Sequence, residues 1–102
     1  MDYRIIWSPE ALTQLSQAVH FIAQDNPTAA AQIGQAIIDK ALLLGHFPRL
    51  GKIYRKMQRD DFRETPVPPY RVIYQIRDEQ NRIDILSVWH TAREEPEIHE
   101  IL

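Results

Sequence analysis

The sequence predicts an α+β domain in which a helical hairpin packs against one face of a small, largely antiparallel sheet. Three observations support this prediction: a short β-branched and aromatic run near the N-terminus, two amphipathic segments joined by a very short turn, and several strand-like runs in the second half of the chain. The expected order of elements is β-α-α-β-β-β, in a single domain that spans residues 1–102.

The first expected strand covers residues 3–7, where the sequence reads YRIIW. A helix should follow at once, because Ser8 can cap its first turn, Pro9 suits the first helical position and Glu10 lies at the positive end. Four apolar residues then recur at the spacing of an amphipathic helix, which we expect to end near residue 25: Leu12, Leu15, Val19 and Ile22.

A second helix is expected directly after the first, because Asn26-Pro27 repeats the combination of a capping residue and a proline. Gly34 lies inside this helix at a cost of about 1 kcal/mol relative to alanine, which we attribute to close approach of the first helix. Gly45 and Pro48 should end it, so that the two helices form an antiparallel hairpin. Its apolar stripe comprises Ile33, Ile37, Ala41 and Leu44, widened by Ile38 and Leu42.

The second half of the chain contains three strand-like runs, at residues 61–65, 70–77 and 82–90. A polar, basic and turn-like segment at residues 49–60 precedes them. The connection at residues 78–81 has a common length for a hairpin, so the last two runs should pair in antiparallel fashion.

The register of this hairpin places two candidate residues side by side. We expect Arg77 to pair with Arg82 across the connection. Continuing the ladder from this pair, Arg71 then pairs with Val88. Because side chains alternate between faces, Arg71 and His90 should share one face as diagonal neighbours about 7–8 Å apart. A shift of the register by one residue would separate them onto opposite faces.

Arg63, Arg71 and His90 would then line one open face of the sheet. These side chains suit cleavage of RNA by attack of its own 2′-hydroxyl, with His90 as acid or base and the arginines stabilising the developing charge on phosphorus. The alternative interpretation is structural. A strand-end histidine is often simply hydrogen-bonded, and a strand arginine often covers apolar surface or pairs with acids such as Glu94 or Glu95.

The chain has a formal net charge of −2, yet residues 49–77 carry eight basic side chains against three acidic ones. A solvated loop would account for this run, and an anionic partner, either nucleic acid or an acidic protein segment, is the sharper alternative. The residues that we assign to binding such a partner are Arg49, Lys52, Arg55, Lys56, Arg59 and Arg93.

Composition argues against several other classes of protein and of site. The chain has no cysteine, so it has no disulfide and no thiolate nucleophile. Its four histidines lack the spacing of metal ligands, and we expect neither a metal site nor a cofactor. No apolar run is long enough to span a membrane, and the first residues lack the charged-then-apolar plan of a signal peptide, so we expect a soluble cytoplasmic protein without a membrane partner.

Five stretches of the chain, in this order, match a known pattern: WSPEA, IAQDNPTAAAQ, HFPRLGK, PYRVIY and VWHTARE. Together they resemble the RelE/ParE superfamily, the toxins of bacterial type II toxin–antitoxin modules, which are often called plasmid stabilisation proteins. The resemblance covers nearly the whole chain. It implies the fold expected above and a cognate antitoxin, whose acidic and apolar segment would fold on the toxin, and it leaves a homodimer open.

The superfamily implies two alternative activities. RelE-like members cut mRNA at the ribosome without metal; by position Arg71 and His90 are similar to their strand arginine and their acid/base residue, and Arg63 is similar to the arginine of the preceding strand. ParE-like members poison DNA gyrase and need no nuclease residues. The DNPTAAAQ junction, the long helical hairpin, FPRLG and the negative net charge favour the ParE-like branch. Ribosome-dependent mRNA cleavage is the alternative, and an inactive toxin fold that only binds its antitoxin is a further one.

Overall fold

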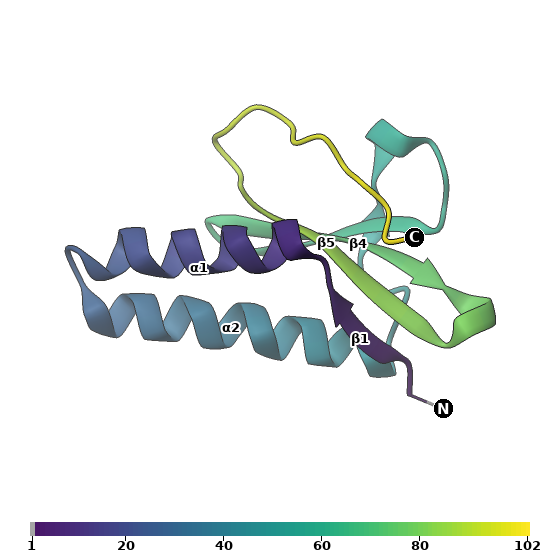
Figure 1. Ribbon diagram of the computed structural model, residues 1–102, viewed down its shortest axis with the longest axis horizontal. Helices are drawn as coiled ribbons and strands as arrows, with labels where there is room; N and C mark the ends of the chain where they lie inside the picture. Colours follow the sequence, from purple (N-terminus) through teal and green to yellow (C-terminus); the bar gives the residue numbers. More distant parts are fainter. Residues whose placement is uncertain (1) are drawn as a thin grey trace.

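The computed structural model describes residues 2–102, which form a five-stranded mixed sheet with two helices packed against one face (Figure 1). The strand order is β1-β5-β4-β3-β2, with β1 parallel to β5 and every other neighbouring pair antiparallel. The predicted α+β class and the order of the main elements are confirmed. In chain order these are β1 (Arg4–Trp7), α1 (Pro9–Ala23), α2 (Pro27–His46), β2 (Lys52–Ile53), β3 (Phe62–Val67), β4 (Tyr70–Arg77) and β5 (Arg82–His90).

Two elements depart from the sequence-based prediction. The segment expected to be turn-like contains the short strand β2 and a 3₁₀ turn over Arg55–Met57. Strand β3 continues two residues beyond its expected end, through Pro66. Since β2 pairs with β3 only at Arg63 and Glu64, Pro66 lies where that edge of β3 is free and a missing N–H costs nothing.

Both helices begin at the predicted caps. The Ser8 hydroxyl accepts a hydrogen bond from the Ala11 N–H at 3.0 Å, and the Asn26 side-chain oxygen accepts one from the Ala29 N–H at the same distance. Each cap satisfies one of the amides that a helix leaves without an intrahelical partner.

The helices approach each other closely at Gly34, as predicted. A Cβ atom at this position would lie 3.1 Å from Cγ2 of Val19. The predicted widening of the α2 stripe is wrong, however, because Ile38 and Leu42 are 39% and 58% exposed. Of the predicted stripe, Ile37, Ala41 and Leu44 are fully buried and Ile33 is partly buried. The next positions around the helix turn toward solvent.

The predicted register of the β4–β5 hairpin is correct at its closed end and wrong beyond it. Arg77 pairs with Arg82 as expected, but the register shifts by one residue between Ile73 and Tyr74. Arg71 therefore faces Trp89 instead of the expected Val88.

This shift is a β-bulge on β5 at Leu86, the residue that has no partner on β4. It allows Ile85 and Val88 to pack under the helices while Leu86 packs on the other side of the sheet. Strict alternation from Ile85 would have put Trp89 under the helices in place of Val88. The prediction that Arg71 and His90 share one face is consequently wrong.

The two faces of the sheet carry separate apolar clusters. The larger one lies between the sheet and the helices. The second, which we call the open-face cluster, lies on the opposite side and is formed by Tyr54, Phe62, Ile73 and Leu86, joined by Met57, Ile98 and Ile101. The C-terminal residues 91–102, here called the tail, arch over this side of the sheet (Figure 1). The tail therefore covers apolar residues on this face of the sheet, as the helices do on the other face.

Candidate functional site

Arg71 lies on the open face between two carboxylates. Its guanidinium contacts Glu64 Oε1 at 3.1 Å and Glu95 Oε1 at 2.6 Å. The side chains of Arg71 and Glu64 are each only 15% exposed, so this ion pair is largely withdrawn from water. The guanidinium carbon also lies 6.0 Å from the centroid of the Tyr54 ring. In this arrangement the positive charge of Arg71 is already balanced by the protein itself.

Tyr54 completes the surroundings of Glu95. Its hydroxyl donates a hydrogen bond to Glu95 Oε2 at 2.6 Å. This bond, together with the Arg71 guanidinium, holds the pKa of Glu95 below its usual value. Burial and the neighbouring Glu95 carboxylate raise the pKa of Tyr54. The phenol therefore stays protonated and acts as a donor, which suits a structural role.

A pocket of about 240 Å³ is lined by this ion-pair cluster and by Lys52, Arg55 and Lys56. Lys56 donates a hydrogen bond to the Pro96 carbonyl of the tail at 2.8 Å. The side chains of Lys52 and Arg55 are exposed and make no hydrogen bond or ion pair with residues 2–102. Two of the predicted anion-binding cations thus remain open to a partner beside the tail.

Farther along the tail, Glu100 meets a second group of basic and polar side chains. It contacts Arg59 at 3.4 Å, Arg77 at 3.5 Å and the Gln75 amide at 3.1 Å. Arg77 in turn pairs with the fully buried Asp84 at 2.7 Å. An acidic and apolar segment therefore already occupies the open face, and that segment belongs to the chain itself.

Arg63 does not join Arg71. It pairs with Tyr74, whose side chain lies in the cluster beneath the helices, so Arg63 projects from the face opposite to Arg71. Its guanidinium donates to the backbone carbonyls of Asp60 at 2.7 Å and Gly51 at 3.2 Å. These bonds tie the loop before β3 to the loop before β2. Arg49, another predicted binding residue, pairs with Asp78 at 2.7 Å.

His90 lies on the helix side, at the end of β5. It pairs with Tyr70 across the hairpin, and the two rings pack edge to face with centroids 5.2 Å apart. Its Nδ1 accepts a hydrogen bond from the Ala92 N–H at 3.1 Å. A neutral imidazole that accepts at Nδ1 carries its proton at Nε2, so His90 presents a donor on its free side.

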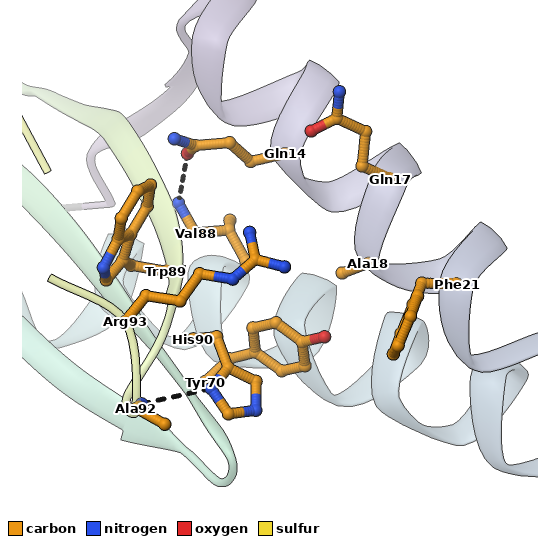
Figure 2. Close-up of a pocket in the computed structure, with 10 residues that line it drawn as sticks. All are labelled: Gln14, Gln17, Ala18, Phe21, Tyr70, Val88, Trp89, His90, Ala92 and Arg93. Carbon is orange, nitrogen blue, oxygen red and sulfur yellow. Dashed lines mark hydrogen bonds between the residues drawn. The ribbon is translucent and has the colours of Figure 1, made fainter.

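A larger pocket of about 630 Å³ opens beside His90, between α1 and the end of β5 (Figure 2). Figure 2 shows the Arg93 side chain extending across this space toward α1, with the Tyr70 hydroxyl pointing into it and Phe21 on the far side. The structure thus brings His90 and Arg93 together, whereas the sequence paired His90 with Arg71. Gln14 and Gln17 of α1, which sequence reasoning missed, complete the rim.

Within residues 2–102, no three His, Asp or Glu side chains lie close enough together to hold a metal ion. Over the same residues no helix is both long and apolar enough to cross a membrane. The site residues that sequence reasoning missed on the open face are Glu64 and Tyr54. The structural interpretation of Arg71 predicts pairing with Glu94 or Glu95, and the contact with Glu95 is present.

Residues 5–95 match the family model described as the ParE toxin of type II toxin–antitoxin system, parDE. Toxin RelE2 of Caulobacter vibrioides is 27% identical over 90 residues, which cover 88% of this chain and 97% of that protein.

Solved structures with the same fold include three toxin or toxin–antitoxin structures. The chromosomal ParDE system from P. aeruginosa superposes with a TM-score of 0.68 at 18% identity, covering 86% of this chain and 95% of that chain. A mutant of the E. coli toxin RelE in the free state gives 0.68 at 18% identity, with coverages of 90% and 86%. The toxin–antitoxin complex RelBE2 from Mycobacterium tuberculosis gives 0.64 at 25% identity, with coverages of 88% and 99%.

Proposed function

Because this chain belongs to the ParE toxin family of type II toxin–antitoxin systems, we propose that it inhibits growth by poisoning DNA gyrase and that a cognate antitoxin neutralises it. In this proposal the protein acts by binding its target and performs no hydrolysis of its own.

The observation that carries the proposal is the separation of the residues expected in a nuclease. A metal-independent ribonuclease needs its acid/base group within reach of the cation that stabilises the phosphorane. Arg71 and His90 project from opposite faces of the sheet, and Arg71 is held by Glu64 and Glu95. Arg63 is also directed away from Arg71 and is bound to backbone carbonyls. The open face therefore favours a binding function.

The proposed antitoxin fits the chemistry of the exposed surface. The open face accepts an acidic and apolar segment, since the tail already binds there through Glu95, Glu100 and Ile101. A partner segment of the same chemistry would find Lys52 and Arg55 beside the tail. Two of the solved structures similar to this chain are described as a ParDE system and a RelBE2 complex, which supports a partner of this kind.

A test in cells separates the two activities. The wild-type protein and His90→Ala would be induced without antitoxin, and DNA and transcripts would be probed separately. We expect cleaved or unsupercoiled DNA with intact mRNA in both strains. Ribosome-dependent mRNA cleavage that is lost in His90→Ala, but retained in His99→Ala at an exposed position of the tail, would overturn the proposal.

The second candidate function is RNA cleavage, and one observation favours it. His90 and Arg93 lie in the same pocket, so an acid/base group and a cation are close together there even though Arg71 is not involved. The similar protein from Caulobacter vibrioides is also named RelE2. Under this alternative, His90→Ala and Arg93→Ala would each abolish mRNA cleavage.

An inactive toxin fold that only binds its antitoxin is the third candidate. It predicts that the wild type leaves growth, DNA and transcripts unchanged when induced alone, while still forming a stable complex with the antitoxin. Growth arrest by the wild type would exclude it.

A further inference from the structure

Half of strand β5 has no neighbouring strand on one side. β1 pairs with β5 only from Arg82 to Ile85, whereas β5 continues to His90. Beyond Trp7 the chain turns into α1, which runs alongside the remaining part of β5 (Figure 1). The stretch from Leu86 to His90 is therefore a free sheet edge that faces the pocket between α1 and β5.

Side chains stand in for a strand along the first part of this edge. The Ser8 hydroxyl donates to the Leu86 carbonyl at 3.3 Å. The Gln14 side-chain oxygen accepts the backbone N–H of Val88 at 2.8 Å and the Ser87 hydroxyl at 3.0 Å, as Figure 2 shows for Val88. The Val88 N–H thus points away from β4 and toward the pocket.

Two backbone groups on this edge are left for a partner. The carbonyl of a strand residue points to the same side as its N–H, so the Val88 carbonyl faces the pocket, and so does the N–H of His90 two residues later. The next residue supports this direction for the His90 N–H. The N–H of Thr91 points to the opposite side, where it donates to the Pro69 carbonyl at 2.9 Å. One residue of an added parallel strand could donate to Val88 and accept from His90.

The pocket beside this edge suits an apolar and anionic occupant. Phe21 lines the pocket and is 66% exposed, and Tyr70 and Val88 add apolar surface to its wall. Arg93 crosses the pocket and forms no ion pair with residues 2–102, and His90 presents its Nε2 donor. Of the described residues that line the pocket, none is Asp or Glu. Although the chain has a net charge of −2, the cation and the donor make this pocket a suitable site for a carboxylate.

We propose that an extended segment of the cognate antitoxin adds to the free edge of β5 as a parallel strand, in line with β1. It would hydrogen-bond to the Val88 carbonyl and the His90 N–H, pack an apolar side chain against Phe21 and place a carboxylate at Arg93. This inference rests on the proposed antitoxin partner and assigns it a second site, on the helix side of the sheet, in addition to the one beside the tail.

Hydrogen exchange of the full toxin–antitoxin complex tests the backbone pairing. The His90 amide should exchange at least about tenfold more slowly in the complex than in the free chain, since a paired edge amide is protected. The amide of Val88, which Gln14 already holds, should change less.

A matched pair of variants tests the same hydrogen bond by affinity, with overlapping synthetic peptides that tile the antitoxin as the probe. His90→Ala removes the imidazole and keeps the N–H, whereas His90→Pro removes both. Because this N–H faces away from β4, neither variant breaks the hairpin ladder. We expect His90→Pro to bind the best peptide about tenfold more weakly than His90→Ala. Arg93→Glu should weaken binding by about tenfold or more, and Arg4→Glu, at the distant end of the same edge, by much less.

The outcomes of these experiments distinguish the added strand, its occupant and the antitoxin partner. A protected His90 amide with weakened His90→Pro and Arg93→Glu supports the strand. A stable complex with an unprotected His90 amide, or equal binding by His90→Pro and His90→Ala, overturns the strand and leaves the antitoxin in place. Protection of the same amides by an RNA oligonucleotide or by a second copy of the chain, but not by antitoxin, overturns the proposed occupant. Absence of any complex with the antitoxin overturns the proposed partner itself.

Discussion

Arg71 and His90 belong to adjacent pairs of the β4–β5 hairpin, yet their side chains leave the sheet on opposite faces, because the bulge at Leu86 shifts the register by one residue. Arg71 is drawn into an ion-pair cluster beneath the tail, and His90 into a pocket beside α1. One local irregularity thus separates a pair that an unbroken ladder would have placed together, and the consequences can be measured.

The first prediction concerns the ion pairs of Arg71. Arg71→Ala leaves Glu64 with a largely buried, uncompensated charge, so we expect the free energy of unfolding to fall by about 2 kcal/mol. Arg55→Ala, which removes an exposed cation without a partner in residues 2–102, should change it by less than about 0.5 kcal/mol. Urea denaturation of the two variants is the measurement. Equal losses in both would contradict the structural role assigned to Arg71.

The second prediction concerns the pH dependence of tail binding. The pKa of Glu95 is lowered in the folded chain, so its contribution to stability is present above its usual value of 4.5 and is lost as the pH falls through the lowered folded value. Tyr54→Phe removes the first cause of this shift, and the pKa of Glu95 should rise. An NMR titration of the Glu95 carboxyl measures it. Tyr3→Phe, which removes a hydroxyl bound to Asp78, should leave Glu95 unchanged.

The third prediction tests whether the tail is part of the core. Ile101 packs against the open-face cluster, whereas the adjacent Leu102 is fully exposed. Ile101→Ala should lower the free energy of unfolding by about 1 kcal/mol, and Leu102→Ala by no more than a few tenths. Thermal unfolding of the two variants compares them directly. If they unfold alike, the tail does not cover the sheet in solution.

The fourth prediction contrasts two glycines of α2. A Cβ at Gly45 would lie 2.8 Å from the backbone carbonyl oxygen of Tyr3, so Gly45→Ala must displace the backbone that leads into β1 and should cost about 2 kcal/mol. A Cβ at Gly34 would meet only the Val19 side chain, at 3.1 Å. Gly34→Ala should be milder, because that side chain can move and alanine favours the helix by about 1 kcal/mol. A larger loss at Gly34 than at Gly45 would contradict this packing.

Local signals in the sequence were sufficient for the starts of both helices and for their close approach, but not for the end of α2, which runs past Gly45 to His46. The caps at Ser8 and Asn26 and the close approach at Gly34 depend on neighbouring residues or on one nearby contact, and the structure confirms all three. The two-residue strand β2 gave no such signal, since Lys52 and Ile53 acquire strand structure only by pairing with β3.

The bulge could not be predicted because its supports come from distant parts of the chain. Ser8 and Gln14 hold the backbone around Leu86 and Val88 through hydrogen bonds that span more than 70 residues. The run from Ile85 to Val88 reads as an ordinary strand by itself. For the same reason, sequence reasoning identified Arg71 and His90 as polar residues in unusual positions but assigned them to one site, which the structure divides into two.

The most direct test of the proposed function is a supercoiling assay with purified DNA gyrase and purified toxin, using the wild type and His90→Ala. We predict that both proteins inhibit supercoiling and trap cleaved DNA, and that the antitoxin relieves this inhibition. Full gyrase activity in the presence of excess wild-type protein would contradict gyrase poisoning and would leave RNA cleavage and an inactive toxin fold as the remaining candidates.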